Sequence, residues 1–246
     1  MQRIDSEKLI DEVVRVVGGQ RVRELVGENP PFDNADYLFT KDNIISELKD
    51  LEKDFLSDPT VNDRMQEMYN RWLDEGKEIP TMYGEGVLQT DQIPVECARK
   101  LMGIFKDKLE SAVLRKANRQ IRETKEKLNY PNALGLLLLS NEGNFVFDPE
   151  MTAHVLFHSL GAKFSSIEHV ILVSANLRIT ASTMAPMGPP FISIRCPNRR
   201  QPSDEFIQRL GSSWYGVLGA ATGRKFAPFR PTTSAPADIA RLRFLS

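Results

Sequence analysis

The sequence predicts an α/β fold in which a mixed β-sheet is flanked by helices. Two short segments rich in strand-forming residues, 35–39 and 43–49, lie close enough in the chain to pair as an antiparallel hairpin. Two later segments, 135–140 and 168–175, are continuous apolar runs typical of buried strands, and each follows a helical pattern. Because strands joined through helices usually pair in parallel, the combination predicts a sheet with both strand directions.

The composition is that of one folded globular domain, which we expect to span residues 1–246. Hydrophobic residues make up 41% of the chain and charged residues 26%, with 32 Lys and Arg against 33 Asp and Glu, which excludes collagen-like, disordered and disulfide-rich proteins. No apolar run is long enough to cross a bilayer, so we expect no membrane partner. The N-terminus is charged and lacks the apolar core of a signal peptide, which predicts a cytoplasmic protein. Cys97 and Cys196 have no partner motif and are expected to be free and buried.

The other elements follow from periodicity and from the positions of Gly and Pro. An apolar stripe at helical spacing predicts a first helix with Ser6 as its N-cap and Gly18-Gly19 as its end. Alternation predicts a strand over 20–26, and two consecutive prolines predict a turn within 27–34. The later predictions are a helix from Val61 to Trp72, a loop over 76–94, one long helix or two in succession over 95–128, a strand over 135–140, a helix after Pro149, strands over 168–175 and 191–195, a helix over 204–218 capped by Ser203, and a loop over 222–236.

The helix and loop that follow the hairpin separate it from the long helical pattern. We therefore interpret residues 55–110 as a helical insertion within the domain.

Charged side chains on the hairpin predict a metal site. Glu47 and Lys49 are two residues apart on a strand, so their side chains project from the same face. The hairpin brings Asp36, on the preceding strand, towards Glu47. Two carboxylates held so close repel each other unless a cation lies between them, and hard oxygen ligands suit Mg²⁺ or Mn²⁺.

The spacing of these residues resembles the signature of the PD-(D/E)XK nuclease superfamily. Asp36 is followed after ten residues by Glu47-Leu48-Lys49, and the helical segment 116–121 precedes the apolar strand 135–139, in the order of the core helix and following strand of that family. The resemblance implies a restriction-endonuclease-like fold and covers the core of the chain. The sequence departs from the family pattern at Ala35, where Pro is usual, and in the roughly 60 residues between Lys49 and the helix.

The resemblance also implies a role for each of these residues. Asp36, Glu47 and the Leu48 carbonyl would ligate Mg²⁺ or Mn²⁺, Lys49 would orient or activate the attacking water, and Gln120 would support the site, with Lys116 one turn earlier able to face the same way. An acid of the first helix, Asp11 or Glu12, is left open as a further member.

The function expected from the resemblance is a metal-dependent DNA endonuclease of restriction or defence type. Its substrate would be a nucleic acid, and both a homodimer and a partner subunit stay open. A basic excess of five charges over residues 196–246, which includes Arg199 to Arg243, is the expected source of phosphate contacts.

Two other interpretations of the charged residues stay open. The first is a non-catalytic module that binds nucleic acid or protein on the same fold, and the second is an unrelated α/β scaffold with solvated charges.

His154 and His158 are interpreted as a partly buried structural pair, because no Glu follows His154 as in a zinc protease motif. No Gly-rich phosphate loop or Ser-His-Asp order occurs, so nucleotide motors and serine hydrolases are not supported.

Overall fold

The computed structural model describes residues 3–27, 30–80, 92–144, 146–147, 149–176, 178–181, 189–196, 198–230 and 242–245. The helices are α1 (Ser6–Val17), α2 (Val22–Val26), η1 (Phe55–Ser57), α3 (Pro59–Asp74), α4 (Val95–Leu109), the π-helical turn η3 (Glu110–Leu114), α5 (Arg115–Lys127), α6 (Pro149–Ala162) and α7 (Asp204–Thr222). The strands are β1 (Gln20–Arg21), β2 (Tyr37–Phe39), β3 (Ile44–Leu51), β4 (Leu134–Asn141), β5 (His169–Val173), β6 (Arg178–Ala181), β7 (Phe191–Arg195) and β8 (Leu242–Leu245).

Six strands form one mixed sheet in the order β1-β2-β3-β4-β5-β7, and β6 pairs with β8 in a separate two-stranded sheet. Strands β1, β2 and β3 pair antiparallel, β4 and β5 are parallel to β3, and β7 is antiparallel to β5. The predicted α/β class and mixed sheet are therefore confirmed, as is the hairpin of β2 and β3.

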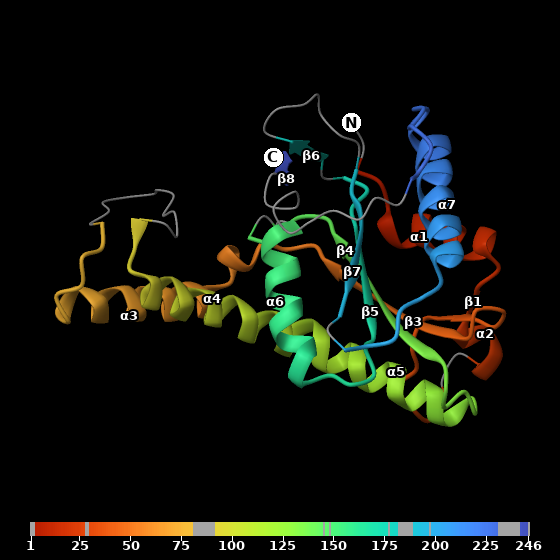
Figure 1. The fold of residues 1–246 in the computed structure, drawn as a ribbon, viewed down its shortest axis with the longest axis horizontal. Helices are drawn as coiled ribbons and strands as arrows, with labels where there is room; N and C mark the ends of the chain where they lie inside the picture. The colour runs from red at the N-terminus through yellow and green to blue at the C-terminus, as the bar shows by residue number, and fades with distance from the viewer. Residues whose placement is uncertain are drawn as a thin grey trace.

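Helices cover both faces of the large sheet (Figure 1). One hydrophobic cluster joins α1 and α7 to the sheet, and a second joins α4, α5 and α6 to the other face. We call these the α1/α7 face and the α5 face. Buried Trp214 belongs to the first cluster and buried Trp72 to the second, while Cys97 and Cys196 are free and buried, as expected.

The N-terminal elements differ from the prediction in two details. The N-cap of α1 is Asp5, whose carboxylate accepts a bond from the Lys8 N–H at 3.1 Å, because Ser6 instead donates its hydroxyl to Asp50. The predicted strand over 20–26 is wrong beyond Arg21, since α2 begins at Val22. The Val22 N–H bonds to the Asp36 carbonyl and its side chain is fully buried, so the chain turns into a helix there.

The long helical pattern forms two helices, α4 and α5, joined end to end by the π-helical turn η3. Helix α4 leads through η3 into α5 without a break, and α3 and α4 project away from the sheet (Figure 1). The predicted loop over 76–94 is described at 76–80 and 92–94, and its remainder, residues 81–91, lies outside the described residues. Strands β6 and β8 were not predicted.

Among the described residues, no helix combines the length and apolar character that a membrane crossing needs.

Gly135 permits the close packing of β4, whose residues are all buried. A Cβ atom at this position would lie 1.7 Å from the Ser166 carbonyl oxygen, which is backbone and has little freedom to move. We expect Gly135→Ala to lower the free energy of unfolding by about 3 kcal/mol or more. Equilibrium denaturation measures the change. In the control Gly161→Ala the new methyl group meets open space on α6, and stability should rise by about 1 kcal/mol; equal stability of the two variants would contradict the prediction.

Candidate active site

The hairpin register brings Asp36 and Glu47 to the same face of the sheet. Tyr37 pairs with Ser46 and Leu38 with Ile45, so Asp36, which immediately precedes β2, lies opposite Glu47. Leu38 and Ile45 each lie two residues from one of the carboxylates and belong to the cluster packed against α5. Because side chains alternate along a strand, both carboxylates point to the α5 face.

Hydrogen bonds link the side chains predicted for the site. The Asp36 carboxylate accepts a bond from the Leu48 N–H at 2.8 Å. The Lys49 ammonium donates to Glu47 Oε1 and, at 3.0 Å, to Gln120 Oε1. The structure therefore joins Lys49, Glu47 and Gln120 in one hydrogen-bonded group, although Lys49 and Gln120 are 71 positions apart in the sequence.

Burial leaves the two carboxylates short of compensating charge. Glu47 is 1% exposed, and burial together with repulsion from Asp36 raises its pKa to about 8, against the opposing effect of Lys49. Burial also raises the pKa of Asp36, although the Leu48 N–H and Lys49 counteract the rise. Glu47 Oε2 is buried and has no hydrogen-bond partner among the described residues. An acceptor with this environment favours a bound cation.

The residues present fit a hard divalent cation. Mg²⁺ in proteins is often held through one or two carboxylates and keeps several water ligands. Asp36 and Glu47 supply two such carboxylates, and the unpartnered Glu47 Oε2 is a buried oxygen available to a cation. Within the described part of the chain, no group of three His, Cys, Asp or Glu side chains could hold a metal. The Leu48 carbonyl and water would have to complete the coordination.

Helix α5 fixes the backbone that precedes Asp36. Thr124 Oγ1 accepts a bond from the Ala35 N–H at 2.7 Å, and Gln120 Nε2 donates to the Asn34 carbonyl at 2.9 Å. Gln120 thus bonds both to Lys49 and to the segment that carries Asp36. Thr124 was missed in the sequence analysis, although its position one turn after Gln120 places it on the same side of the helix.

Loss of the Thr124 hydroxyl should weaken the attachment of the segment before Asp36 to α5. In Thr124→Val the buried Ala35 N–H has no acceptor, and we expect the free energy of unfolding to fall by about 1–3 kcal/mol. Thr124→Ser keeps the hydroxyl and is the matched control. Equilibrium denaturation of both variants measures the difference, and a valine variant as stable as the serine variant would contradict the role of the bond.

Three further candidates lie outside this group. Lys116 is exposed and has no hydrogen bond or ion pair with the carboxylates among the described residues, while Glu12 is exposed on α1. Asp11 is engaged elsewhere, since it accepts bonds from Arg21 and from the Tyr37 hydroxyl at 2.9 Å. Neither acid of α1 therefore joins Asp36 and Glu47. Among the described residues, no three His, Cys, Asp or Glu side chains form a metal site.

The histidine pair lies on a different surface. The rings of His154 and His158 are 4.6 Å apart on α6, and both side chains are exposed, so the expectation of partial burial is wrong. The pair lies on the outward side of the helix because Val155 and Leu156 occupy the inward side.

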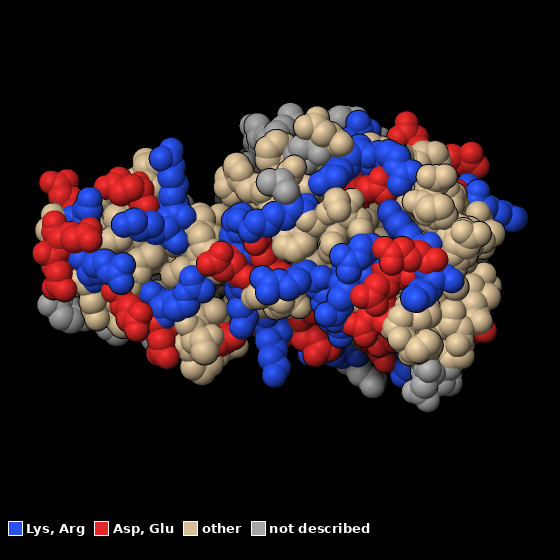
Figure 2. Space-filling model, turned by 90° about the horizontal axis from the view of Figure 1, so that it is seen from below, with Lys and Arg blue, Asp and Glu red and all other residues tan. Residues whose placement is uncertain are grey.

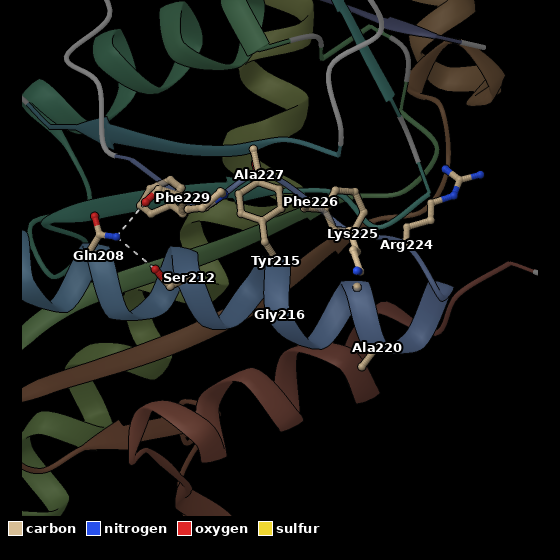
Figure 3. A pocket seen from close by; sticks show the side chains of 12 residues that line it. Gln208, Ser212, Tyr215, Gly216, Ala220, Arg224, Lys225, Phe226, Ala227 and Phe229 are labelled. Carbon is tan, nitrogen blue, oxygen red and sulfur yellow. Dashed lines mark hydrogen bonds between the residues drawn. The ribbon is translucent and has the colours of Figure 1, made fainter.

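An open groove lies on the α1/α7 face of the molecule, between α7 and residues 224–229 (Figure 3). Gln208 donates to the Phe229 carbonyl at 2.8 Å and holds this segment against the helix. A Cβ at Gly211 would lie 2.4 Å from the Phe229 ring, so the glycine admits the close approach. The groove is separated by the sheet from Asp36 and Glu47 and is not part of the carboxylate site.

Comparison of the chain with protein-family models, with curated proteins and with solved structures finds no match.

Proposed function

We propose that the protein is a metal-dependent nuclease that hydrolyses phosphodiester bonds, with DNA as its substrate. The observation that carries this proposal is the unpartnered buried oxygen of Glu47, beside Asp36 and within the hydrogen-bonded group of Lys49 and Gln120. Two carboxylates and one lysine that share a site fit metal-assisted hydrolysis better than they fit a solvated surface, because Glu47 is buried. The PD-(D/E)XK resemblance supports the same reaction and suggests a restriction or defence role in the cytoplasm.

Each residue would act through the contacts that it already makes. Asp36 and Glu47 would hold the divalent ion, which when bound supplies Lewis-acid stabilisation of the phosphoryl oxygens and lowers the pKa of water. Lys49 would place its ammonium beside the attacking water and the scissile phosphate, since its position is fixed from both sides by Glu47 and Gln120. Gln120 would be a positioning residue that acts through Lys49.

The rival proposal is a non-catalytic module that binds nucleic acid or protein. The projecting helices α3 and α4 favour it, since they extend away from the sheet and leave Leu56, Leu73 and Val95 exposed near their ends. Such a module has no need for a buried carboxylate without a partner, so we prefer the nuclease.

A DNA cleavage assay distinguishes the nuclease from the non-catalytic binding module. The purified chain should nick or cut plasmid DNA with Mg²⁺ or Mn²⁺ and not with EDTA, and Glu47→Gln, purified identically, should be inactive, which excludes a contaminating nuclease. RNA incubated in parallel tests the choice of DNA. If the chain binds DNA or RNA and cuts neither, the module is preferred; if it does neither, nucleic acid is the wrong substrate class.

A further inference from the structure

Four cations line the outer side of α5, and we call Arg115, Lys116, Arg119 and Arg122 the basic ridge. All four side chains are exposed, with Arg119 52% and Arg122 53% accessible. Their spacing keeps them away from Ala117, Ile121 and Thr124, through which α5 packs on the sheet. No acidic residue occurs in the sequence between Ser111 and Arg122. Figure 2, which views the molecule from the side of α4 and α5, shows Lys and Arg across the middle of this surface, with Asp and Glu between them.

The basic ridge borders the carboxylate site. Arg119 forms an ion pair with Asp33, three residues before Asp36. The next residue, Gln120, bonds to Lys49 at 3.0 Å. A chain of phosphates lying along the ridge would therefore pass beside the side chains of the proposed nuclease.

Three arginines of the basic C-terminal region are engaged within the fold. Arg200 donates to Glu168 at 2.5 and 2.7 Å and to two backbone carbonyls, and Arg209 makes two bonds to Asp42 at 2.7 and 2.8 Å. Arg199 donates to the Leu160 carbonyl at 3.3 Å. These guanidinium groups stabilise the fold. On the ridge, Arg119 is paired with Asp33 and Arg122 lies 3.9 Å from Glu123, whereas Arg115 and Lys116 have no ion pair among the described residues.

We propose that the basic ridge binds the phosphate backbone of duplex DNA and aligns it with the carboxylate site. The proposal rests on the proposed nuclease function and names the surface that holds its substrate. From Arg115 to Arg122 the helix rises by about 10 Å, which is roughly three steps of 3.4 Å along the axis of a duplex. Proteins that bind single strands stack the bases on aromatic side chains, and no aromatic residue occurs from Ser111 to Asn129. The ridge therefore fits a duplex, in which the bases are already stacked.

Binding is measured separately from cleavage, in full-length protein that carries Glu47→Gln and in the presence of EDTA. Fluorescence anisotropy with a labelled DNA duplex gives the affinity over a range of NaCl concentrations. The test variant adds Arg115→Gln, Lys116→Gln and Arg122→Gln and leaves Arg119, which holds Asp33, in place. The control instead adds Arg3→Gln, Lys8→Gln and Arg15→Gln, three exposed cations in or just before α1. Gln resembles Lys and Arg in helix propensity, so the test variant should fold, and circular dichroism checks this.

The ridge variant should bind at least about tenfold more weakly, and its slope of log affinity against log salt should fall by about 2–3, whatever the DNA sequence. The control should match the parent. A ridge variant that binds like the control overturns the proposal, as does a parent that binds no duplex DNA or prefers duplex RNA or single strands. If the wild-type protein cuts DNA but DNA binding does not depend on the basic ridge, the nuclease proposal stands and the proposed binding surface is wrong. If DNA binding depends on the basic ridge but the wild-type protein does not cut DNA, the nuclease proposal is wrong and the binding surface stands.

Discussion

Glu47→Gln is expected to abolish metal-dependent cleavage and, at the same time, to stabilise the metal-free protein. The carboxylate is buried, and one of its oxygens has no partner among the described residues, so its ionised form destabilises the fold. An amide of the same shape removes that charge together with the metal ligand. We expect cleavage to fall by roughly a thousandfold or more and the free energy of unfolding to rise by about 0.5–2 kcal/mol.

The pH dependence of the stability gain tests its physical cause. Because burial raises the pKa of Glu47 from 4.5 to about 8, the folded state binds a proton that the unfolded state releases, and stability is lost as pH rises through this range. The difference between Glu47→Gln and wild type in EDTA should therefore be larger at pH 8 than at pH 5, as measured by equilibrium denaturation.

Glu52 supplies the control, since it lies one residue beyond β3 and its side chain is exposed. Glu52→Gln should change neither cleavage nor stability by much. Retained cleavage in Glu47→Gln would remove Glu47 from the mechanism, and a loss of stability in EDTA would show that its carboxylate is better compensated by Lys49 than we infer.

The hairpin and its carboxylates could be predicted because they depend on local geometry. Alternation along a strand places Glu47 and Lys49 on one face whatever surrounds them, and a short connection leaves few ways to pair the two strands. The apolar runs of β4 and β5 were equally clear, since a strand buried on both faces needs little besides hydrophobic residues.

The contacts of α5 could not be derived in this way. Gln120 was assigned from a resemblance, and its bonds to Lys49 and to the Asn34 carbonyl depend on how the helix packs against segments that lie 71 and 86 positions away in the sequence. The bond from Ala35 to Thr124 has no local signature, because a threonine within a helix usually has no such partner. Tertiary packing decides these contacts.

For a related reason, charge counting could not show which cations are free to bind phosphate. The basic excess after residue 196 indicated a phosphate-binding region, yet Arg200 and Arg209 are held by Glu168 and Asp42, which lie far from them in the sequence. Net charge along a sequence does not distinguish cations that pair internally from cations that stay exposed. Only the three-dimensional partners make that distinction.

Lys49→Met is expected to abolish cleavage, by about a hundredfold or more, while metal binding is retained. The ammonium donates to Glu47 and to Gln120, and methionine has a similar length without the charge or the donors. Without Lys49 the two carboxylates lose their nearest cation, so Mn²⁺ should bind at least as tightly as in wild type, as measured by calorimetry. This separates the lysine from Glu47, whose replacement should remove both properties.

Lys49→Arg is the conservative comparison, and we expect it to stay impaired. The planar guanidinium is larger than the ammonium and presents its donors in a fixed fork, whereas the space between Glu47 and Gln120 holds a compact group that is only 17% exposed. If Lys49→Met loses Mn²⁺ binding together with cleavage, the lysine organises the metal ligands instead of the attacking water. If both variants cut DNA at the wild-type rate, Lys49 is dispensable, and the hydrolytic water must be oriented by another group at the site.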